Sequence, residues 1–329
     1  QPDSYQLVVT ARYRELTSTE SVAFAITLSG ESRLIIRLFD LGENESGGGG
    51  DAILITDSSS AGMRHALVDA GPAGVGGSDV NLVRRELDAL GVDTLVAMVL
   101  SHAHSDHFGG MAPVLQNQVV ERFYANGQVR NFSAYTALIT EAQIRANTYV
   151  EPAAVTELPL GFGADPATLA IIPPLTTFLG DANADASEIN EGSIGTEVVK
   201  GAFRMFLTGD GEVLANLRWR TSYGSRSGPL TALKVGHHGA NDAVFDNGFN
   251  GSSAWLAHTA PELAVITANG TTHPRINATT ALLNVPALEV FCTHVHGDIT
   301  IRVGDQGMYM VTVEKNEGQS CTPGRDATT

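Results

Sequence analysis

The segment Ser101–His107 concentrates side chains that could bind metal ions. It reads SHAHSDH and supplies four candidate ligands within six residues, at His102, His104, Asp106 and His107. Imidazole and carboxylate are ligands that zinc takes, and His-x-His presents two imidazoles on one side of an extended segment. Asp106 and His107 follow where the chain must turn, so they can face a second metal ion. A histidine-rich surface loop is the alternative, but so dense a cluster indicates a site.

A further candidate ligand lies at the end of another apolar run. Asp210 follows the segment 203–209, FRMFLTG, whose first residues read as a buried strand. A lone carboxylate there would be costly unless a metal ion or a charged partner offset it. The sequence therefore predicts that Asp210 binds metal, with a purely structural acid as the alternative.

These residues resemble the signature of the metallo-β-lactamase superfamily. His102-Ala-His104-Ser-Asp106-His107 matches its H-x-H-x-D-H motif. The resemblance implies an α+β fold, an αββα sandwich in which two packed mixed β-sheets carry helices on their outer faces. It also implies two Zn²⁺ ions per chain, with Mn²⁺ or Fe²⁺ as substitutes.

Other landmarks of the superfamily follow in order. Asp69, in LVDAG, matches an aspartate that supports the metal ligands, although it could simply be an acid that caps a turn. Asp210, in FLTGD, matches the carboxylate that bridges the two ions. In LKVGHHG the resemblance selects His238 as the ligand and leaves His237 as a contact to substrate or to a ligand.

The finer pattern resembles the hydrolase domain of ComEC-type DNA-uptake proteins and bacterial phosphorylcholine esterases. The motifs that carry it lie between about Arg33 and Val313 and are LFDLG, DAILI, LVDAG, LTGD, LKVGHHGA, THP and FCTHVHGDITI. His273, in THP, matches a late histidine near the substrate, and an exposed turn residue is the alternative.

The sequence departs from the superfamily at the first metal ion. Most members have a third histidine between the H-x-H-x-D-H segment and the bridging aspartate, but no histidine occurs between His107 and His237. The ion at His102 and His104 would then be less fully held, leaving room for water or a substrate oxygen. Asn190 and Ser193 resemble a subgroup motif and could fill part of the gap, in support of the ligands.

Strands with helices between them must position these residues. We expect a helix from Ser78 or Asp79 to Leu90, a helix over 132–150, a proline-rich loop over 152–174 and a short helix after Asp210. Residues 1–30 read as an N-terminal extension with extra edge strands, 31–315 as the hydrolase domain and 316–329 as a tail. The expected strands are 5–10, 22–28, 33–41, 51–56, 66–69, 94–100, 194–200, 203–208, 230–235, 263–267, 288–292, 298–303 and 308–313.

Composition restricts the partners. The formal net charge of −16 makes sequence-independent binding of long nucleic acid unfavourable, so a small-molecule substrate fits better. No apolar run is long enough for a transmembrane segment, which favours a soluble protein. Cys292 and Cys321 could form a disulfide in a secreted or otherwise exported protein, or could remain as free thiols. The first residue, Gln1, suggests a processed or trimmed chain.

The predicted chemistry is metal-assisted hydrolysis, most simply of a small phosphodiester or phosphomonoester. Asp106 or Asp210 would orient the nucleophile and accept its proton, and His273 or His237 would stabilise the departing oxygen. One alternative is ring opening of a lactone or β-lactam at the same metal pair. Another is a non-catalytic accessory domain, which the intact ligand set disfavours. A redox di-iron enzyme would normally carry a flavin domain, for which this chain has no room.

Overall fold

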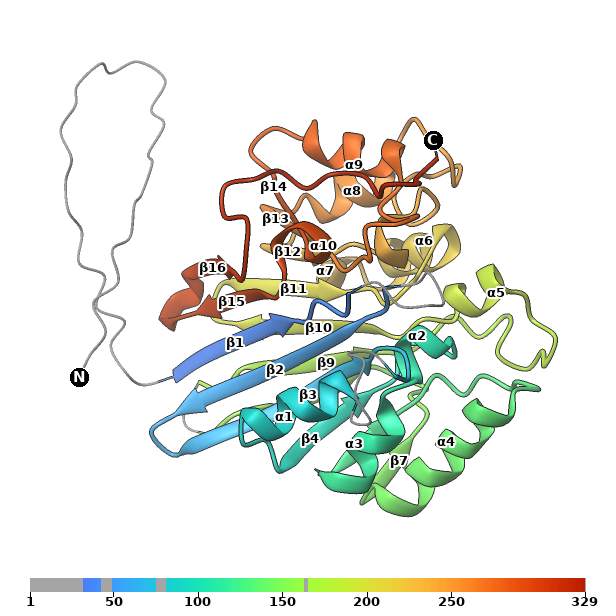
Figure 1. Ribbon diagram of the computed structural model, residues 1–329, viewed down its shortest axis with the longest axis vertical. Coiled ribbons are helices and arrows are strands. Elements are labelled where there is room, and N and C mark those ends of the chain that lie inside the picture. Colours follow the sequence, from blue (N-terminus) through green and yellow to red (C-terminus); the bar gives the residue numbers. More distant parts are fainter. Residues whose placement is uncertain (1–31, 43–48, 75–80, 163–164, 329) are drawn as a thin grey trace.

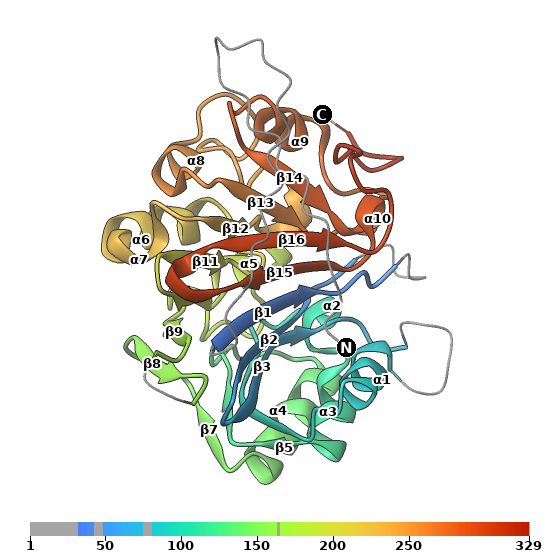
Figure 2. The same ribbon diagram turned by 90° about the vertical axis from the view of Figure 1, so that its left-hand side faces the viewer.

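Two β-sheets packed face to face form the centre of the molecule. The computed structural model describes residues 32–42, 49–74, 81–162 and 165–328. Within these ranges one sheet has nine strands in the order β16-β15-β1-β2-β3-β4-β6-β7, with β5 beside β4, and the other has seven in the order β14-β13-β12-β11-β10-β9-β8. Figure 2 shows the strands β16, β15, β1, β2 and β3 side by side.

Both sheets are mixed. In the first, β3, β4, β5, β6 and β7 pair in parallel and the other pairings are antiparallel; in the second, β11 to β14 pair in parallel and the other pairings are antiparallel. The strands of the first sheet are β1 (Ser32–Leu38), β2 (Ala52–Ser59), β3 (Gly62–Ala70), β4 (Thr94–Val99), β5 (Val119–Val120), β6 (Arg122–Tyr124), β7 (Thr148–Val150), β15 (Ile299–Val303) and β16 (Tyr309–Val313). Those of the second are β8 (Thr156–Pro159), β9 (Thr168–Ile172), β10 (Gly195–Lys200), β11 (Phe203–Leu207), β12 (Ala232–Lys234), β13 (Leu263–Ile266) and β14 (Glu289–Cys292).

Helices cover the outer face of each sheet (Figure 1). Beside the first sheet lie α1 (Leu82–Ala89), α3 (Met111–Asn117) and α4 (Ser133–Arg145), and beside the second lie α6 (Val213–Ser222), α7 (Gly224–Ser227), α8 (Ala254–Thr259) and α9 (Ile276–Leu283). The shorter helices are α2 (Ser105–Phe108), α5 (Ala186–Glu191), α10 (Thr293–His296) and the 3₁₀ turns η1 (His237–Gly239) and η2 (Asp305–Gly307).

Separate apolar clusters hold these layers together. The inner cluster joins the facing sides of the sheets, with Ile36 and Val68 from the first and Met205 and Val265 from the second. Another cluster fills the space between the first sheet and its helices, and two more lie under the helices of the second. This confirms the predicted αββα sandwich, and buried apolar area of this extent is the main term that stabilises such layers.

Several predicted boundaries were wrong. The first helix begins at Leu82, where Asn81 caps it by accepting a hydrogen bond from Arg84 N at 3.2 Å; the predicted caps Ser78 and Asp79 lie outside the described residues. The expected helix over 132–150 ends at Arg145, since the backbone then pairs with β6 to form β7.

The segment 152–174 contains β8 and β9, although its prolines predicted a loop. Pro159 ends β8, the edge strand of its sheet, where a missing N–H group is tolerated. The strands expected at 5–10 and 22–28, the whole extension 1–30 and most of the glycine-rich segment 43–50 lie outside the described residues.

Candidate metal centre

Strand ends from both sheets bring the predicted ligands to one place. Asp69 lies in β3 near its end, His102 to His107 follow β4, Asp210 follows β11 and His238 follows β12. Within each sheet these strands run parallel, so their carboxyl ends share one edge. The two edges face each other at the same end of the sandwich, which gathers residues far apart in the sequence.

The segment after β4 splits into two groups. His102 is fully buried, and its Nε2 atom lies 3.0 Å from Nδ1 of His104. The chain then turns into α2, which carries Asp106 and His107, and the His107 ring centroid lies 4.1 Å from that of His102. Asp210 lies between the groups, since its Oδ2 atom is 3.9 Å from His102 Nε2 and 3.2 Å from His107 Nε2.

The second group forms a compact set of metal-ligating atoms. One ligand atom from each of Asp106, His107, Asp210 and His238 lies within 4.8 Å of the others. His238 Nε2 is 3.2 Å from Asp210 Oδ2 and 3.4 Å from Asp106 Oδ2. Tetrahedral zinc with ligand bonds of about 2.0–2.1 Å places its ligand atoms roughly 3.3–3.4 Å apart, so these spacings suit a zinc ion.

Unsatisfied nitrogen atoms support the same fit. Among the described residues, the buried Nε2 atoms of His107 and His238 have no hydrogen-bond partner, and neither does Asp210 Oδ1. Buried polar atoms are nearly always paired, so two such nitrogen atoms that each lie 3.2 Å from Asp210 Oδ2 indicate a ligand that the protein is built to receive. A divalent cation at this point, offset by the neighbouring carboxylates, would satisfy both, whereas Asp210 Oδ1 faces Lys234 Nζ at 3.7 Å.

Further contacts fix the orientation of the histidines. Asp69 is fully buried and accepts hydrogen bonds from His107 Nδ1 at 2.8 Å and from Ser101 N and Oγ at 2.8 and 2.6 Å. His238 Nδ1 donates to Thr267 O at 2.8 Å. Each contact holds the Nδ1 proton and turns Nε2 towards the site, as the residues around metal-binding histidines commonly do.

The sequence analysis missed a buried ion pair beneath this centre. Lys234, fully buried in β12, donates to Gly209 O at 2.8 Å and forms an ion pair with Asp51. Its Nζ atom is 3.7 Å from Asp210 Oδ1, and Asp51 lies 3.6 Å from His238 Nδ1. A lysine inside an otherwise apolar strand, TALKV, was the available signal.

His237 and His273 lie beside the centre rather than in the compact set. His237 Nδ1 is 3.1 Å from both Glu212 Oε1 and Asp242 Oδ1. Its ring centroid is 5.4 Å from that of His273, which lies 6.2 Å from His238. These histidines therefore line the approach to the metal ligands.

Asn190 and Ser193, predicted to compensate in part for the missing third histidine, contact Glu212 and Asp210. Asn190 Nδ2 donates to Glu212 Oε1 at 2.7 Å, and Ser193 Oγ accepts from Asp210 N at 3.2 Å. Ser193 thus holds the backbone of Asp210, the aspartate predicted to bridge the metal ions, while Asn190 holds a carboxylate that contacts His237.

Burial and neighbouring charges set the protonation of the ligands. Burial lowers the pKa of His102 well below its usual value and that of His104 to about 4, so both imidazoles are neutral. Burial would raise the pKa of Asp210, but His107 and His238 outweigh it and hold that pKa well below its usual value. Burial would likewise lower the pKa of His238, but Asp210 and Asp106 raise it to about 9, so a cation would compete with a proton there.

His237 and His273, which lie beside the centre, differ in the direction of their pKa shifts. Burial lowers the pKa of His237, but Asp242 and Glu212 outweigh it and raise the pKa to about 10. Burial, reinforced by the charges of His238 and His237, lowers the pKa of His273 to about 3. His237 is therefore the cationic neighbour and His273 the neutral one.

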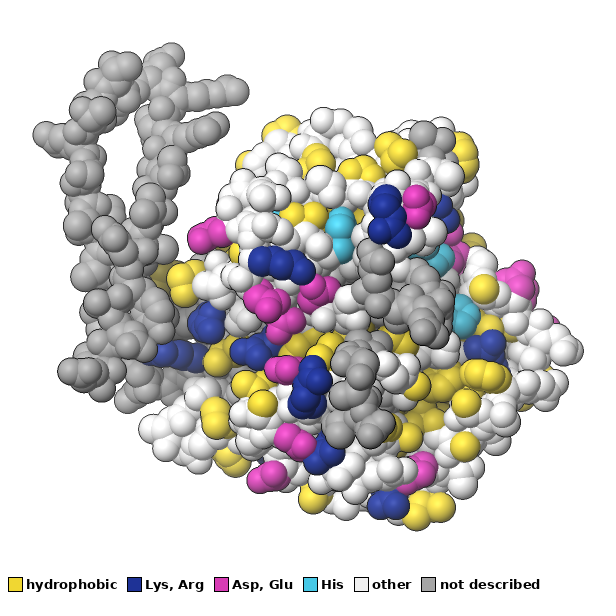
Figure 3. All heavy atoms as spheres, in the orientation of Figure 1, with side chains coloured by type: hydrophobic (Ala, Val, Ile, Leu, Met, Phe, Trp, Pro, Cys, Tyr) yellow, Lys and Arg dark blue, Asp and Glu magenta, His cyan; other side chains and the backbone are white. Residues whose placement is uncertain are grey.

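A basic groove begins next to the first ligand pair. Arg130 donates to the carbonyl oxygen of Ala103, the residue between His102 and His104. A surface groove of about 730 Å³ extends from Arg130 along α4 and is also lined by Phe132 and Arg145. Figure 3 shows histidine side chains at the surface on one face of the molecule, near both acidic and basic side chains.

Comparison with known proteins agrees with this geometry. Residues 46–177 match the family described as "Metallo-beta-lactamase superfamily", a range that includes Asp69 and the segment His102 to His107. No curated protein matches the sequence.

Solved structures share the fold. CmlA, a diiron β-hydroxylase from Streptomyces venezuelae, is 15% identical with a TM-score of 0.51, and the match covers 83% of this chain and 54% of that one. A CmlA β-hydroxylase E377D mutant is 14% identical with a TM-score of 0.50, covering 82% and 54%. The chain thus spans about half the length of these proteins, and at such identity the likeness shows the fold alone.

Proposed function

We propose that this chain, which has the metallo-β-lactamase fold, is a zinc-dependent hydrolase of small phosphodiesters or phosphomonoesters. The observation that carries the proposal is that the buried Nε2 atoms of His107 and His238, which have no hydrogen-bond partner among the described residues, each lie 3.2 Å from Asp210 Oδ2. Asp210 also faces His102, so one carboxylate serves both groups of ligands.

The two groups would hold two ions. His102 and His104 would bind the first, Asp106, His107 and His238 the second, and Asp210 would contact both. Bound divalent cations would activate a water molecule and polarise the phosphoryl oxygen. The ionised state of Asp210 and the neutral state of His102 suit these roles.

Residues around the ligands would handle protons and substrate. The Asp106 side chain is 28% exposed, so a water molecule can reach its carboxylate, which would orient that water and accept its proton. Asp210 is the alternative acceptor. His237 and His273 would contact the departing oxygen, because both line the approach to His238.

Charge supports a phosphoester as substrate. Two dications among Asp51, Asp106 and Asp210 would attract an anionic phosphoryl group, and Arg130 begins a groove in which the remainder of the substrate could lie. The overall charge of −16 favours a small substrate, or one with a cationic group, over a long polyanion.

The test is kcat/KM for a chromogenic phosphodiester, a phosphomonoester, a lactone and a cephalosporin at equal zinc concentration and low salt. We expect the phosphoesters to be preferred by more than about tenfold, roughly 1.4 kcal/mol in transition-state stabilisation. Asp210→Ala protein purified in parallel controls for contaminating phosphatases. A preference of similar size for the cephalosporin or lactone would replace this proposal with ring opening.

The identity of the metal is tested separately. We expect close to two zinc equivalents per chain by elemental analysis of protein purified without chelator. Because the likeness to CmlA concerns the fold alone, iron is measured in the same samples. Iron in place of zinc would contradict the proposed cofactor, and absence of any transition metal, with no gain on adding zinc, would contradict the hydrolase proposal.

We also propose that the protein is exported. The disulfide between Cys292 and Cys321 supports this, since such bonds persist in oxidising compartments. Among the helices of the described residues, none is long and apolar enough to cross a membrane.

A further inference from the structure

The C-terminal segment 319–328 runs along the outside of the loop that carries His273. The chain ends beside α9, the helix that follows this loop, in both views (Figure 1, Figure 2). Three consecutive backbone N–H groups of the segment donate hydrogen bonds to carbonyl oxygens of the loop. The pairs are Gly324 with Pro274 at 2.9 Å, Arg325 with Gly270 at 2.7 Å and Asp326 with Thr271 at 2.7 Å.

Gly324 makes this close approach sterically feasible. A Cβ atom at this position would lie 2.5 Å from Thr271 O and 2.8 Å from His273 O, well inside normal contact distance. Any side chain there would push the segment away from the loop. A single methyl group at Gly324 is therefore a local probe of this contact.

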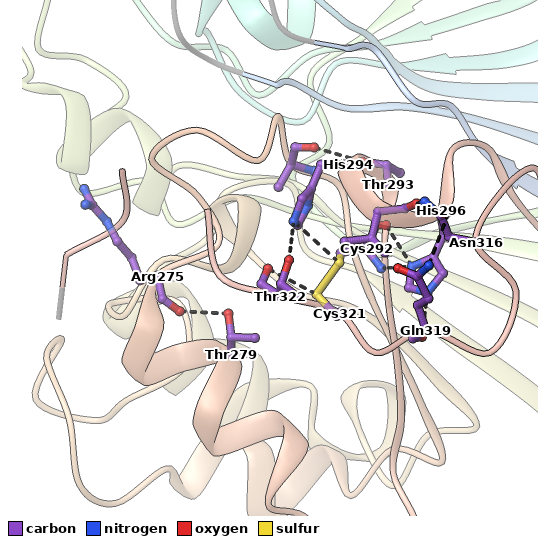
Figure 4. Close-up of a disulfide and its surroundings, with 12 residues drawn as sticks. Arg275, Thr279, Cys292, Thr293, His294, His296, Asn316, Gln319, Cys321 and Thr322 are labelled. Atoms are coloured by element: carbon purple, nitrogen blue, oxygen red, sulfur yellow. Dashed lines mark hydrogen bonds between the residues drawn. A yellow bond between two sulfur atoms is a disulfide. The ribbon is translucent and has the colours of Figure 1, made fainter. Parts of the chain in front are cut away.

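A disulfide anchors the segment just before it reaches the loop. Cys321 is bonded to Cys292 at the end of β14, and both are buried (Figure 4). His296 Nε2 lies 3.1 Å from Gln319 O, and His294 Nε2 lies 3.4 Å from Thr322 Oγ1. Chain ends usually fray unless they are fastened, so this anchor keeps the three backbone bonds formed.

The opposite side of the loop contacts the metal centre. Thr267, where the loop begins, accepts the hydrogen bond from His238 Nδ1. Arg275, where it ends, donates from its backbone to Gly239 O at 2.9 Å. The His273 ring lies between these points and 5.4 Å from the ring of His237. The loop is thus held between the metal ligands and the C-terminal segment.

We propose that the segment 319–328, anchored by the Cys292–Cys321 disulfide, positions His273 at the metal centre. The segment itself touches neither ligand nor substrate site. It acts through the backbone of residues 270–274. The inference rests on the proposed function for its activity measurement, but its structural part can be tested without any substrate.

Three variants separate the contribution of the disulfide from that of the contact between the segment and the loop. Cys292→Ser with Cys321→Ser removes the anchor, and Gly324→Ala lifts the segment from the loop while keeping the disulfide. Ser320→Ala is the matched control, since its side chain is exposed next to the anchor. Each is made alone and combined with His273→Ala. Zinc content, kcat, KM and amide hydrogen exchange of peptides 268–276 and 321–328 are measured.

We expect both perturbing variants to speed exchange in peptides 321–328 and 268–276, with zinc content and exchange elsewhere unchanged. For a phosphodiester, kcat should fall roughly tenfold, because misplacing a reacting group by about 1 Å can cost ~100-fold. Ser320→Ala should match the parent protein. In the His273→Ala background the same changes should lower kcat no further, because His273 is the group they act through.

Two results would overturn the inference. One is unchanged exchange of peptide 268–276 in Gly324→Ala, which retains the disulfide and tests the contact even if the double serine variant does not fold. The other concerns the variants combined with His273→Ala. If their fold-loss in kcat equals the product of the losses in the two single variants, the segment does not act through His273. If the parent protein hydrolyses no phosphoester, the proposed function fails, while hydrogen exchange still decides whether the segment orders the loop.

Discussion

Replacing Lys234 with methionine tests whether the buried ion pair supports the metal centre. Methionine keeps the length of the side chain but removes the charge that Asp51 faces. Asp51 is 1% exposed, so its carboxylate would be left in the interior with Thr267 Oγ1 as donor and with His107 and His238, at 3.8 and 3.6 Å, in place of its direct cationic partner. Breaking a buried pair in this way costs about 3–5 kcal/mol.

The loss of thermal stability in Lys234→Met should depend on whether metal ions are bound. At about 2 °C per kcal/mol for a chain of this size, chelated Lys234→Met protein should melt roughly 6–10 °C below the chelated parent. In zinc-loaded protein the loss should be smaller, because cations near Asp210 partly offset the charge of Asp51. Adding Asp51→Asn to Lys234→Met should restore stability, with a coupling energy of about 1–3 kcal/mol.

The measurement is thermal unfolding by circular dichroism, with and without chelator. Lys200→Met is the matched control, since Lys200 is equally buried but the side chain of its partner Asp165 is 71% exposed. It should cost less, because Asp165 keeps its hydration. Single changes at Lys234 and Asp51 that add within about 0.5 kcal/mol would refute the reasoning.

The remaining predictions concern the ligands and the groove. Asp210→Ala should abolish turnover and lower the zinc content measured by elemental analysis, since it removes the residue that faces both groups of proposed ligands. Full turnover with normal zinc content would mean that Asp210 is purely structural. Arg130→Met should raise KM for an anionic substrate about tenfold, whereas Arg145→Met, farther along the groove, should leave KM unchanged. Equal effects of the two changes on KM would exclude a specific contact between Arg130 and the substrate. On titration with chelator, the ion at His102 and His104 should leave first, because fewer protein atoms hold it, and a single-step loss would contradict this.

Local sequence patterns predicted most of the fold and the ligand segment. The segment from His102 to His107 is contiguous, so its spacing alone indicates a metal site. The strands β10 to β16 follow apolar runs bounded by polar residues and glycine, and each lies within two residues of its predicted limits. Such features depend on neighbours in the chain, which a single sequence displays.

Features that depend on distant partners were missed. Thr148, Tyr149 and Val150 each favour a strand, but a run of three residues next to a helix is too short to be read as one until β6 supplies its pairing edge. Asp51 immediately precedes β2 and Lys234 ends β12, and only the packing of the two sheets brings them together. The cysteines of the C-terminal region left the disulfide and the free-thiol alternatives equally open, because only the fold shows that the chain after β16 returns to the end of β14, where Cys321 meets Cys292.

Asn190 and Ser193 were expected to fill part of the gap left by the missing third histidine, in support of the ligands. Both lie close to Asp210 or to Glu212, which follows it in the same loop. Ser193 contacts the backbone of Asp210 and Asn190 contacts the carboxylate of Glu212, the partner of His237. In the proposed site, a first ion held by two histidines and a shared aspartate would keep more open positions than a fully ligated one. That arrangement would suit an ion that must also accept a substrate oxygen, while the proposed ion at His107 and His238 would be held mainly by protein.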